Sequence, residues 1–184
     1  MKNFLTLLSF LLFLSGCTRS YNFSVPDITP SKQKINVNLD SIAIDHGKYD
    51  PAKPITYIKL EDFTDEEIAE DFLLAWAIAL RDALKKSELF DELAERKLKL
   101  FVGIQDFDTP PFGVHFTTYV STNYQFIDKT SNNIIYSDAV NSEGFVPFDY
   151  SFFGYKRSNE AINRAVQNNI STFISHLQSQ MTSN

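Results

Sequence analysis

The chain contains a single cysteine, Cys17, and this residue directly follows an apolar run. Residues 4–14 are mostly apolar, and Lys2 places a positive charge before them. This order is typical of a secretory signal peptide, and the run is too short to cross a bilayer as a helix, which takes about 20 apolar residues. An exported chain without a second cysteine forms no internal disulfide, so a hydrophobic core must stabilise its fold.

The residues before the cysteine, Leu14-Ser15-Gly16, resemble the bacterial lipobox. The resemblance implies cleavage after residue 16 and attachment of acyl chains, palmitate among them, to Cys17. Several chains make such an anchor stable, because each buried methylene contributes roughly 0.8 kcal/mol. Thr18 stands where an Asp would retain an enterobacterial lipoprotein in the inner membrane, which favours the outer membrane. A buried N-terminal helix with a core cysteine is the alternative, but the order of basic, apolar and small residues fits processing better.

Four segments follow from this interpretation. Residues 1–16 are the signal peptide, and residues 17–34 are the lipidated N-terminus and a flexible tether, because Pro26 and Pro30 interrupt a stretch without periodicity. Residues 35–180 form one globular domain of ordinary size, and residues 181–184 are a C-terminal tail. The membrane is thus an expected partner, reached through the lipid anchor.

Hydrophobic periodicity predicts the elements of the globular domain. Apolar residues alternate with polar ones over residues 35–44, 97–104, 114–126 and 134–140, as in half-buried strands. A four-residue repeat predicts helices over residues 64–87 and 158–180, the first opened by a capping box from Thr64 to Glu67. This order predicts an α+β fold: a two-layer sandwich with a mostly antiparallel sheet of about four strands and two helices on one face.

Charge and composition restrict the partners of this domain. The formal net charge is −6 and the sequence pI is about 5.0, which argues against nucleic acid as an electrostatic partner. Aromatic residues make up 14% of the chain, enough to build a real core without disulfides.

The sequence contains no pattern typical of a catalytic, cofactor-binding or metal site. The three histidines have no zinc-site spacing, and neither a nucleophile elbow nor a phosphate-binding glycine loop is present. His46 beside Asp45 and Asp50 is the one grouping that resembles a metal site, and we expect solvated loop residues there. The acids Asp106 and Asp108 are expected to be solvated residues at the turn that follows a strand. We therefore predict that the protein is not an enzyme and has no cofactor.

One loop is unusual because it is rich in aromatic residues. Between the last predicted strand and the final helix, the sequence places six of them within eleven positions: Phe145, Phe148, Tyr150, Phe152, Phe153 and Tyr155. Such a loop either folds back onto the core or presents a contact surface. We favour self-packing that closes the end of the sandwich. The alternative is an interface for a protein, a lipid tail or peptidoglycan, with Lys156 and Arg157 as a charged rim.

The layout resembles the YajG-like group of small Gram-negative outer-membrane lipoproteins. A tether, a strand, an amphipathic helix, a strand meander and a final helix with Asn159-Glu160-Ala161 carry this resemblance. A similar outline, with Trp76 on the long helix, occurs in the PqiC-like auxiliary lipoproteins of ABC-type lipid transporters. The resemblance implies a non-enzymatic interaction or structural component that faces the periplasm and contacts a protein or another envelope component. A part in a lipid transport system and an envelope-modifying enzyme are the alternatives.

Overall fold

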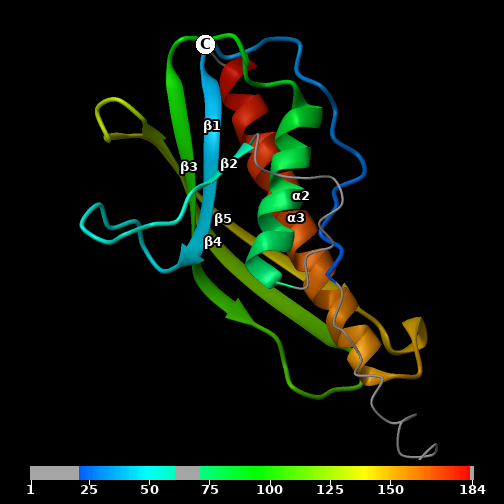
Figure 1. The fold of residues 1–184 in the computed structure, drawn as a ribbon. Coiled ribbons are helices and arrows are strands. Elements are labelled where there is room, and N and C mark those ends of the chain that lie inside the picture. The colour runs from blue at the N-terminus through cyan, green and yellow to red at the C-terminus, as the bar shows by residue number, and fades with distance from the viewer. Residues whose placement is uncertain (1–20, 61–70, 183–184) are drawn as a thin grey trace, which may run out of the picture.

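The computed structural model describes residues 21–60 and 71–182 as one five-stranded sheet covered on one face by two helices (Figure 1). Along the chain the elements are β1 (Asn38–His46), β2 (Ile58–Lys59), α2 (Phe72–Ser87), β3 (Lys97–Asp108), β4 (Phe116–Asp128), β5 (Ile134–Val146), the short 3-10 helix η2 (Phe148–Tyr150) and α3 (Gly154–Thr182). This architecture confirms the predicted α+β two-layer sandwich. Neither α2 nor α3 is both long and apolar enough to span a bilayer, a statement limited to the described residues.

The sheet is mixed, and its strand order is β2-β1-β3-β4-β5. Strands β3, β4 and β5 form the expected antiparallel meander. Strand β1 runs parallel to β3, because α2 carries the chain across the sheet between them. The very short β2 pairs with the outer edge of β1 and makes the fifth strand.

Both helices bury their apolar faces against the same face of the sheet. From α2, Trp76 and Leu80 enter the core, and from α3, Ile170 and Phe173 do so. The ring of Phe173 stacks on that of Tyr124 at 3.8 Å between centroids. Alternate residues of β4 face the helices, which is the period expected of a strand that is half buried.

The first helix differs from its predicted length. Asp71 has an extended backbone (φ −79°, ψ 129°) and caps α2, its carboxylate accepting the N–H of Leu74 at 2.9 Å. A single helix over residues 64–87 is therefore wrong, because α2 begins at Phe72. The predicted capping box from Thr64 to Glu67 lies outside the described residues.

The expected flexible tether is wrong for the part that the structure describes. Residues from Tyr21 onward lie along the helices, and the side chains of Phe23 and Val25 are only 2% and 6% exposed. Phe23 packs edge-on against Phe72 and Trp76 of α2, so it belongs to the core. The signal peptide and Cys17 lie outside the described residues.

Candidate functional site

The six aromatic side chains between positions 145 and 155, which we call the aromatic loop, are all exposed. Their expected place between strand and helix is wrong for two of them, because Phe145 belongs to β5 and Tyr155 to α3. The exposed fractions of the six side chains run from 48% for Tyr150 to 86% for Phe152. The favoured expectation of self-packing is therefore wrong: the core beneath closes without them, through Phe116, Val146 and Ala161. Exposed aromatic rings in such density are typical of a contact surface.

Arg157 holds the backbone of this loop from below. Its guanidinium donates to the carbonyl oxygens of Ser151 and Phe152, the second at 3.2 Å. It also lies over the ring of Phe148, 5.0 Å from the centroid. Arg157 is only 5% exposed, so its expected place on a charged rim is wrong. Lys156 does lie on the surface, with its ammonium 5.6 Å from the ring centroid of Phe153.

A second arginine fixes the other side of the loop. Arg164 of α3 donates to the carbonyl oxygen of Phe145 at 2.8 Å and lies over the ring of Tyr150 at 5.4 Å. Glu160, one turn earlier, holds the guanidinium at 2.8 Å. The loop backbone is thus pinned from two positions on α3 while its rings point outward, so the surface is presented by a rigid support.

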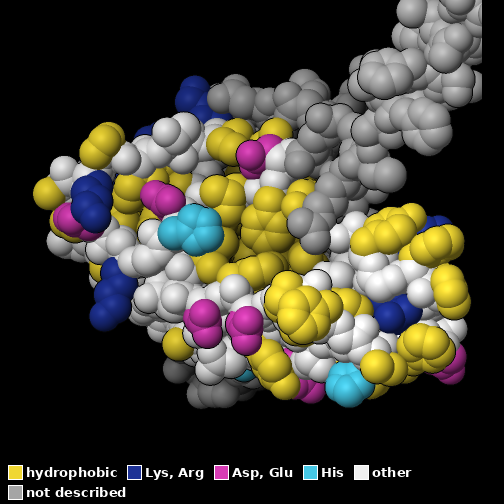
Figure 2. Space-filling model, turned by 90° about the horizontal axis from the view of Figure 1, so that it is seen from below, with side chains coloured by type: hydrophobic (Ala, Val, Ile, Leu, Met, Phe, Trp, Pro, Cys, Tyr) yellow, Lys and Arg dark blue, Asp and Glu magenta, His cyan; other side chains and the backbone are white. Residues whose placement is uncertain are grey.

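The neighbouring β3–β4 connection extends this surface. Arg157 also donates to the carbonyl oxygen of Gly113 at 3.2 Å, which ties the two loops together. On either side of Gly113, Phe112 and Val114 are 84% and 66% exposed. Figure 2 views this end of the molecule and shows hydrophobic side chains gathered over it.

The structure does not assemble the residues that a metal or acid–base site would use. The carboxylate of Asp45 accepts the backbone N–H of His46 at 2.7 Å, and that of Asp50 accepts the N–H of Ala52 at 3.0 Å. The bond from Asp50 to the residue two positions on is the kind by which Asp stabilises a turn. Asp45 and His46 are the last residues of β1, so the expectation that they lie in a loop is wrong. Within residues 21–60 and 71–182, no three His, Cys, Asp or Glu side chains are placed to hold a metal ion.

The other candidate polar residues are scattered over the surface. Asp106 and Asp108 are exposed and belong to β3 itself, opposite Ser121 and Tyr119 of β4, rather than to the turn that follows. On α3, His176 pairs with Asp138 of β5 at 2.9 Å. The exposed His115 lies near Phe145, with 5.9 Å between ring centroids, at the edge of the aromatic loop.

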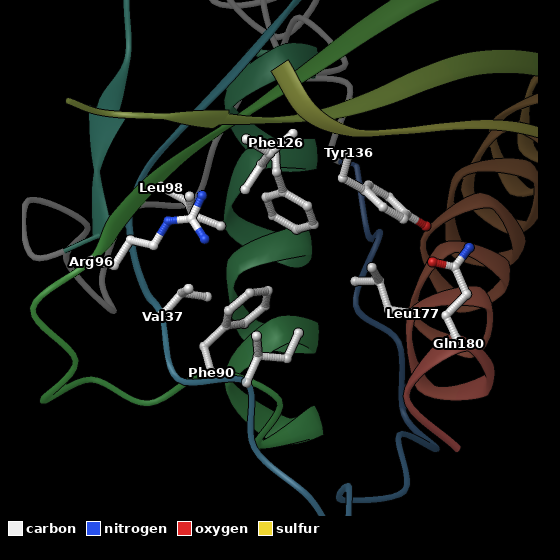
Figure 3. A pocket seen from close by; sticks show the side chains of 10 residues that line it. Val37, Phe90, Arg96, Leu98, Phe126, Tyr136, Leu177 and Gln180 are labelled. Carbon is white, nitrogen blue, oxygen red and sulfur yellow. The ribbon is translucent and has the colours of Figure 1, made fainter. Parts of the chain in front are cut away.

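Sequence reasoning missed an apolar cavity of about 410 Å³ between the sheet and the C-terminal part of α3 (Figure 3). Its volume falls in the range of about 300–1,000 Å³ common for ligand pockets. The lining residues come from separate segments, so no local pattern in the sequence could have revealed them: Ile35, Val37, Phe90, Arg96, Leu98, Phe126, Ile135, Tyr136, Leu177 and Gln180.

Two polar groups border this cavity. The guanidinium of Arg96 donates to the carboxylate of Asp128 at 2.9 Å, and the backbone N–H of Ser131 together with Arg96 lowers the pKa of Asp128 to about 2. The buried hydroxyl of Tyr136 lies beside the side-chain amide of Gln180 (Figure 3). Burial, aided by the carboxylate of Asp138, raises the pKa of Tyr136 to about 12, so its hydroxyl stays a neutral donor.

Comparison with known proteins reveals distant similarity in fold. No family model and no curated protein matches the sequence. Among solved structures, a Xanthomonas campestris protein of family DUF330 aligns over 85% of this chain and 94% of its own, with 11% identity and a TM-score of 0.47. A minor lipoprotein from Acinetobacter baumannii aligns over 81% and 96%, with 10% identity and a TM-score of 0.41. At these scores, neither family nor function is transferred from these proteins.

Proposed function

We propose that this protein is a lipid-anchored lipoprotein of the cell envelope that acts through contacts rather than through catalysis. Acylated Cys17 holds it at the outer membrane, and the globular domain faces the periplasm. This proposal includes the YajG-like resemblance, and it combines the processing signal of residues 1–17 with a surface that the fold presents to a partner.

The exposed aromatic loop is the observation that carries the contact function. Its rings are at least 48% exposed, although they stand on a backbone held by Arg157 and Arg164. Aromatic residues contribute much of the energy at interfaces, since they bury large areas with few rotatable bonds. A loop backbone that is fixed by two arginines, with rings that remain exposed, favours a surface that contacts a partner.

Replacement of the cysteine tests the anchor. In cells fed an acyl-chain label, Cys17→Ala is expected to lose the label completely and to accumulate as the longer precursor, because no thiol remains to acylate. The measurement is gel mobility together with incorporation of the label.

The adjacent residue offers a matched control. Thr18→Asp leaves the thiol in place, so it is expected to label normally while shifting to the inner-membrane fraction in an enterobacterial host. A Cys17→Ala protein that still carries the acyl label would contradict the proposal.

A second candidate function, an accessory role in lipid transport, is favoured by the apolar cavity. Its lining is mainly aliphatic and aromatic, while the guanidinium of Arg96 and the Tyr136 hydroxyl at its border suit the carboxyl end of a fatty acyl chain. Contact of a lipid with this cavity is a role distinct from that of the aromatic loop, which lies at the far end of α3.

Two adjacent isoleucines allow a matched test of the cavity. Ile134 and Ile135 are 46% and 44% exposed, but only Ile135 lines the cavity. A fatty acid carrying a photoactivatable diazirine is added to envelopes and its adducts are mapped by mass spectrometry. Ile135→Glu is expected to remove adducts at the cavity, because it replaces part of the apolar lining with a charged carboxylate that an acyl chain does not pack against. Ile134→Glu is expected to leave the adducts unchanged. Equal labelling of both variants would exclude the cavity as an acyl site.

A further inference from the structure

The N-terminal segment shows at which end of the domain the described chain begins. The N–H of Asn22 donates to the side chain of Asn163 at 3.2 Å, and the carbonyl oxygen of Asn22 accepts from Gln167 at 2.9 Å. Seven residues later, the carbonyl oxygen of Thr29 accepts from Gln178 at 2.7 Å. The segment therefore runs alongside α3 in the same direction (Figure 1), and the chain before Asn22 starts from the side of the N-terminus of α3.

That end of α3 carries the aromatic loop. Asn163 lies nine residues after Gly154, which corresponds to about 14 Å along the helix axis at 1.5 Å per residue. Asn22 lies five positions after Cys17, and a chain of five residue steps reaches at most about 18 Å. The anchored residue can thus reach the level of the loop, and it cannot carry the domain far beyond it.

A lipid anchor at Cys17 would therefore keep the exposed rings within a short distance of the membrane surface. Attachment through so few residues gives the loop a high effective concentration at the bilayer surface. A protein partner of this loop would have to fit into the same narrow space between domain and membrane. The geometry favours lipid as the occupant.

The chemistry of the loop also suits the boundary between water and lipid. Phe, Tyr and a neighbouring Lys are the residues that gather at membrane interfaces, where an aromatic body enters the headgroup region. The exposed charges Asp149 and Lys156 are of opposite sign, so the loop has no net attraction for anionic lipid. Apolar burial would drive the contact, with little dependence on salt.

We propose that the aromatic loop, together with Phe112 and Val114, inserts into the surface of the same bilayer that holds the Cys17 anchor. This inference rests on the proposed lipid anchoring and adds the partner of the loop. Insertion of the loop turns a single-point tether into a two-point attachment. The domain is then oriented with α3 leading away from the membrane.

Tryptophan placed at each end of the domain tests this orientation. The full lipidated protein is reconstituted into phosphatidylcholine vesicles whose acyl chains are brominated, which quench indole only on contact. Phe152→Trp is expected to lose emission relative to unbrominated vesicles, equally at low and high ionic strength. Leu93→Trp is the matched control: Leu93 is 92% exposed, but it lies beyond the C-terminus of α2, at the opposite end. The Leu93→Trp protein is expected to lose no emission in the brominated vesicles.

The native Trp76 serves as an internal reference, because it is fully buried in the core, far from both introduced positions in the chain. The inference would be overturned if neither introduced tryptophan lost emission, or if both lost it equally. Quenching that disappears at high salt would also overturn it, because the contact would then be electrostatic. A loop that crosslinks to a protein in envelopes but is not quenched in vesicles would assign the surface to a protein partner instead.

Acyl labelling of Cys17 in the same preparation separates the two proposals. A labelled protein without quenching at position 152 contradicts the membrane contact alone. An unlabelled protein contradicts both the anchor and the inference that rests on it.

Discussion

Arg157 is a buried cation whose observed partners are backbone carbonyl oxygens rather than a carboxylate. It donates to the oxygens of Ser151, Phe152 and Gly113. Its guanidinium also lies 5.7 Å from the ring centroid of Phe116 and 5.0 Å from that of Phe148. Desolvation of a charge is unfavourable unless hydrogen bonds replace water. The loop backbone supplies these bonds, so loop shape and arginine burial depend on each other.

This dependence predicts a large effect of one substitution at the base of the loop. Arg157→Ala is expected to lower the free energy of unfolding by about 3 kcal/mol, because three carbonyl oxygens lose a charged donor. Urea unfolding of residues 18–184 measures it.

The neighbouring Lys156→Ala is the control for charge. Lys156 is exposed and its cation lies over a single ring, so the expected change is within about 0.5 kcal/mol. Equal effects of the two substitutions would show that Arg157 does not hold the loop.

At the scale of elements, α3 and β5 make an unusually close contact at Gly144. A Cβ built on this glycine would lie 2.1 Å from the carbonyl oxygen of Ala161 and 2.4 Å from the nitrogen of Ala165. One turn further, the buried Asn169 accepts hydrogen bonds from Thr122 at 2.9 Å and Tyr124 at 2.8 Å. A backbone contact and a polar network thus set the position of α3 on the sheet.

The close contact predicts that Gly144→Ala destabilises the domain by about 3 kcal/mol or more, because backbone atoms cannot move aside as a flexible side chain would. Thermal unfolding followed by circular dichroism measures the loss.

Gly154→Ala is the matched control, since the nearest atom to a Cβ there is 3.7 Å away, an ordinary contact. Alanine also favours the helix that begins at this residue. The midpoint temperature of unfolding of Gly154→Ala is expected to stay unchanged or to rise. A Gly144→Ala protein with the stability of the native protein would contradict the close contact between α3 and β5.

The whole molecule has two different ends joined by α3. Gly154 lies at the aromatic loop and Leu177 at the cavity, and their separation of 23 residues corresponds to roughly 34 Å of helix. If the domain contacts the membrane through its aromatic loop, the cavity lies at the end of the domain that is away from the membrane. A lipid in the cavity would then come from the periplasmic side rather than directly from the anchoring bilayer.

Much of the fold could be predicted from local patterns, because burial on one face repeats with the period of each element. Ile162, Ile170 and Leu177 indicated α3, and the alternation around Val120 and Tyr124 indicated β4. The burial of Phe23 could not be predicted in this way, since it depends on Phe72 and Trp76, which are distant in sequence. The parallel pairing of β1 with β3 is likewise a long-range event.

The same distinction between local sequence patterns and long-range contacts applies to the candidate site. The presence of the aromatic cluster between residues 145 and 155 was visible in the sequence, but its exposure was not, because Phe116, Val146 and Ala161 already close the core beneath it. The cavity was invisible, since its walls come from separate segments.

The sequence by itself excluded an internal disulfide, because it holds one cysteine. It also determined the types of the main elements and carries the processing signal that we propose for residues 1–17, because each of these depends on residues close together in the chain. Only the tertiary structure decided that the N-terminal segment is packed, that Arg157 is buried and that the aromatic rings face outward. Those outcomes depend on contacts between residues that are far apart in the sequence, and these contacts exist only once the core has assembled.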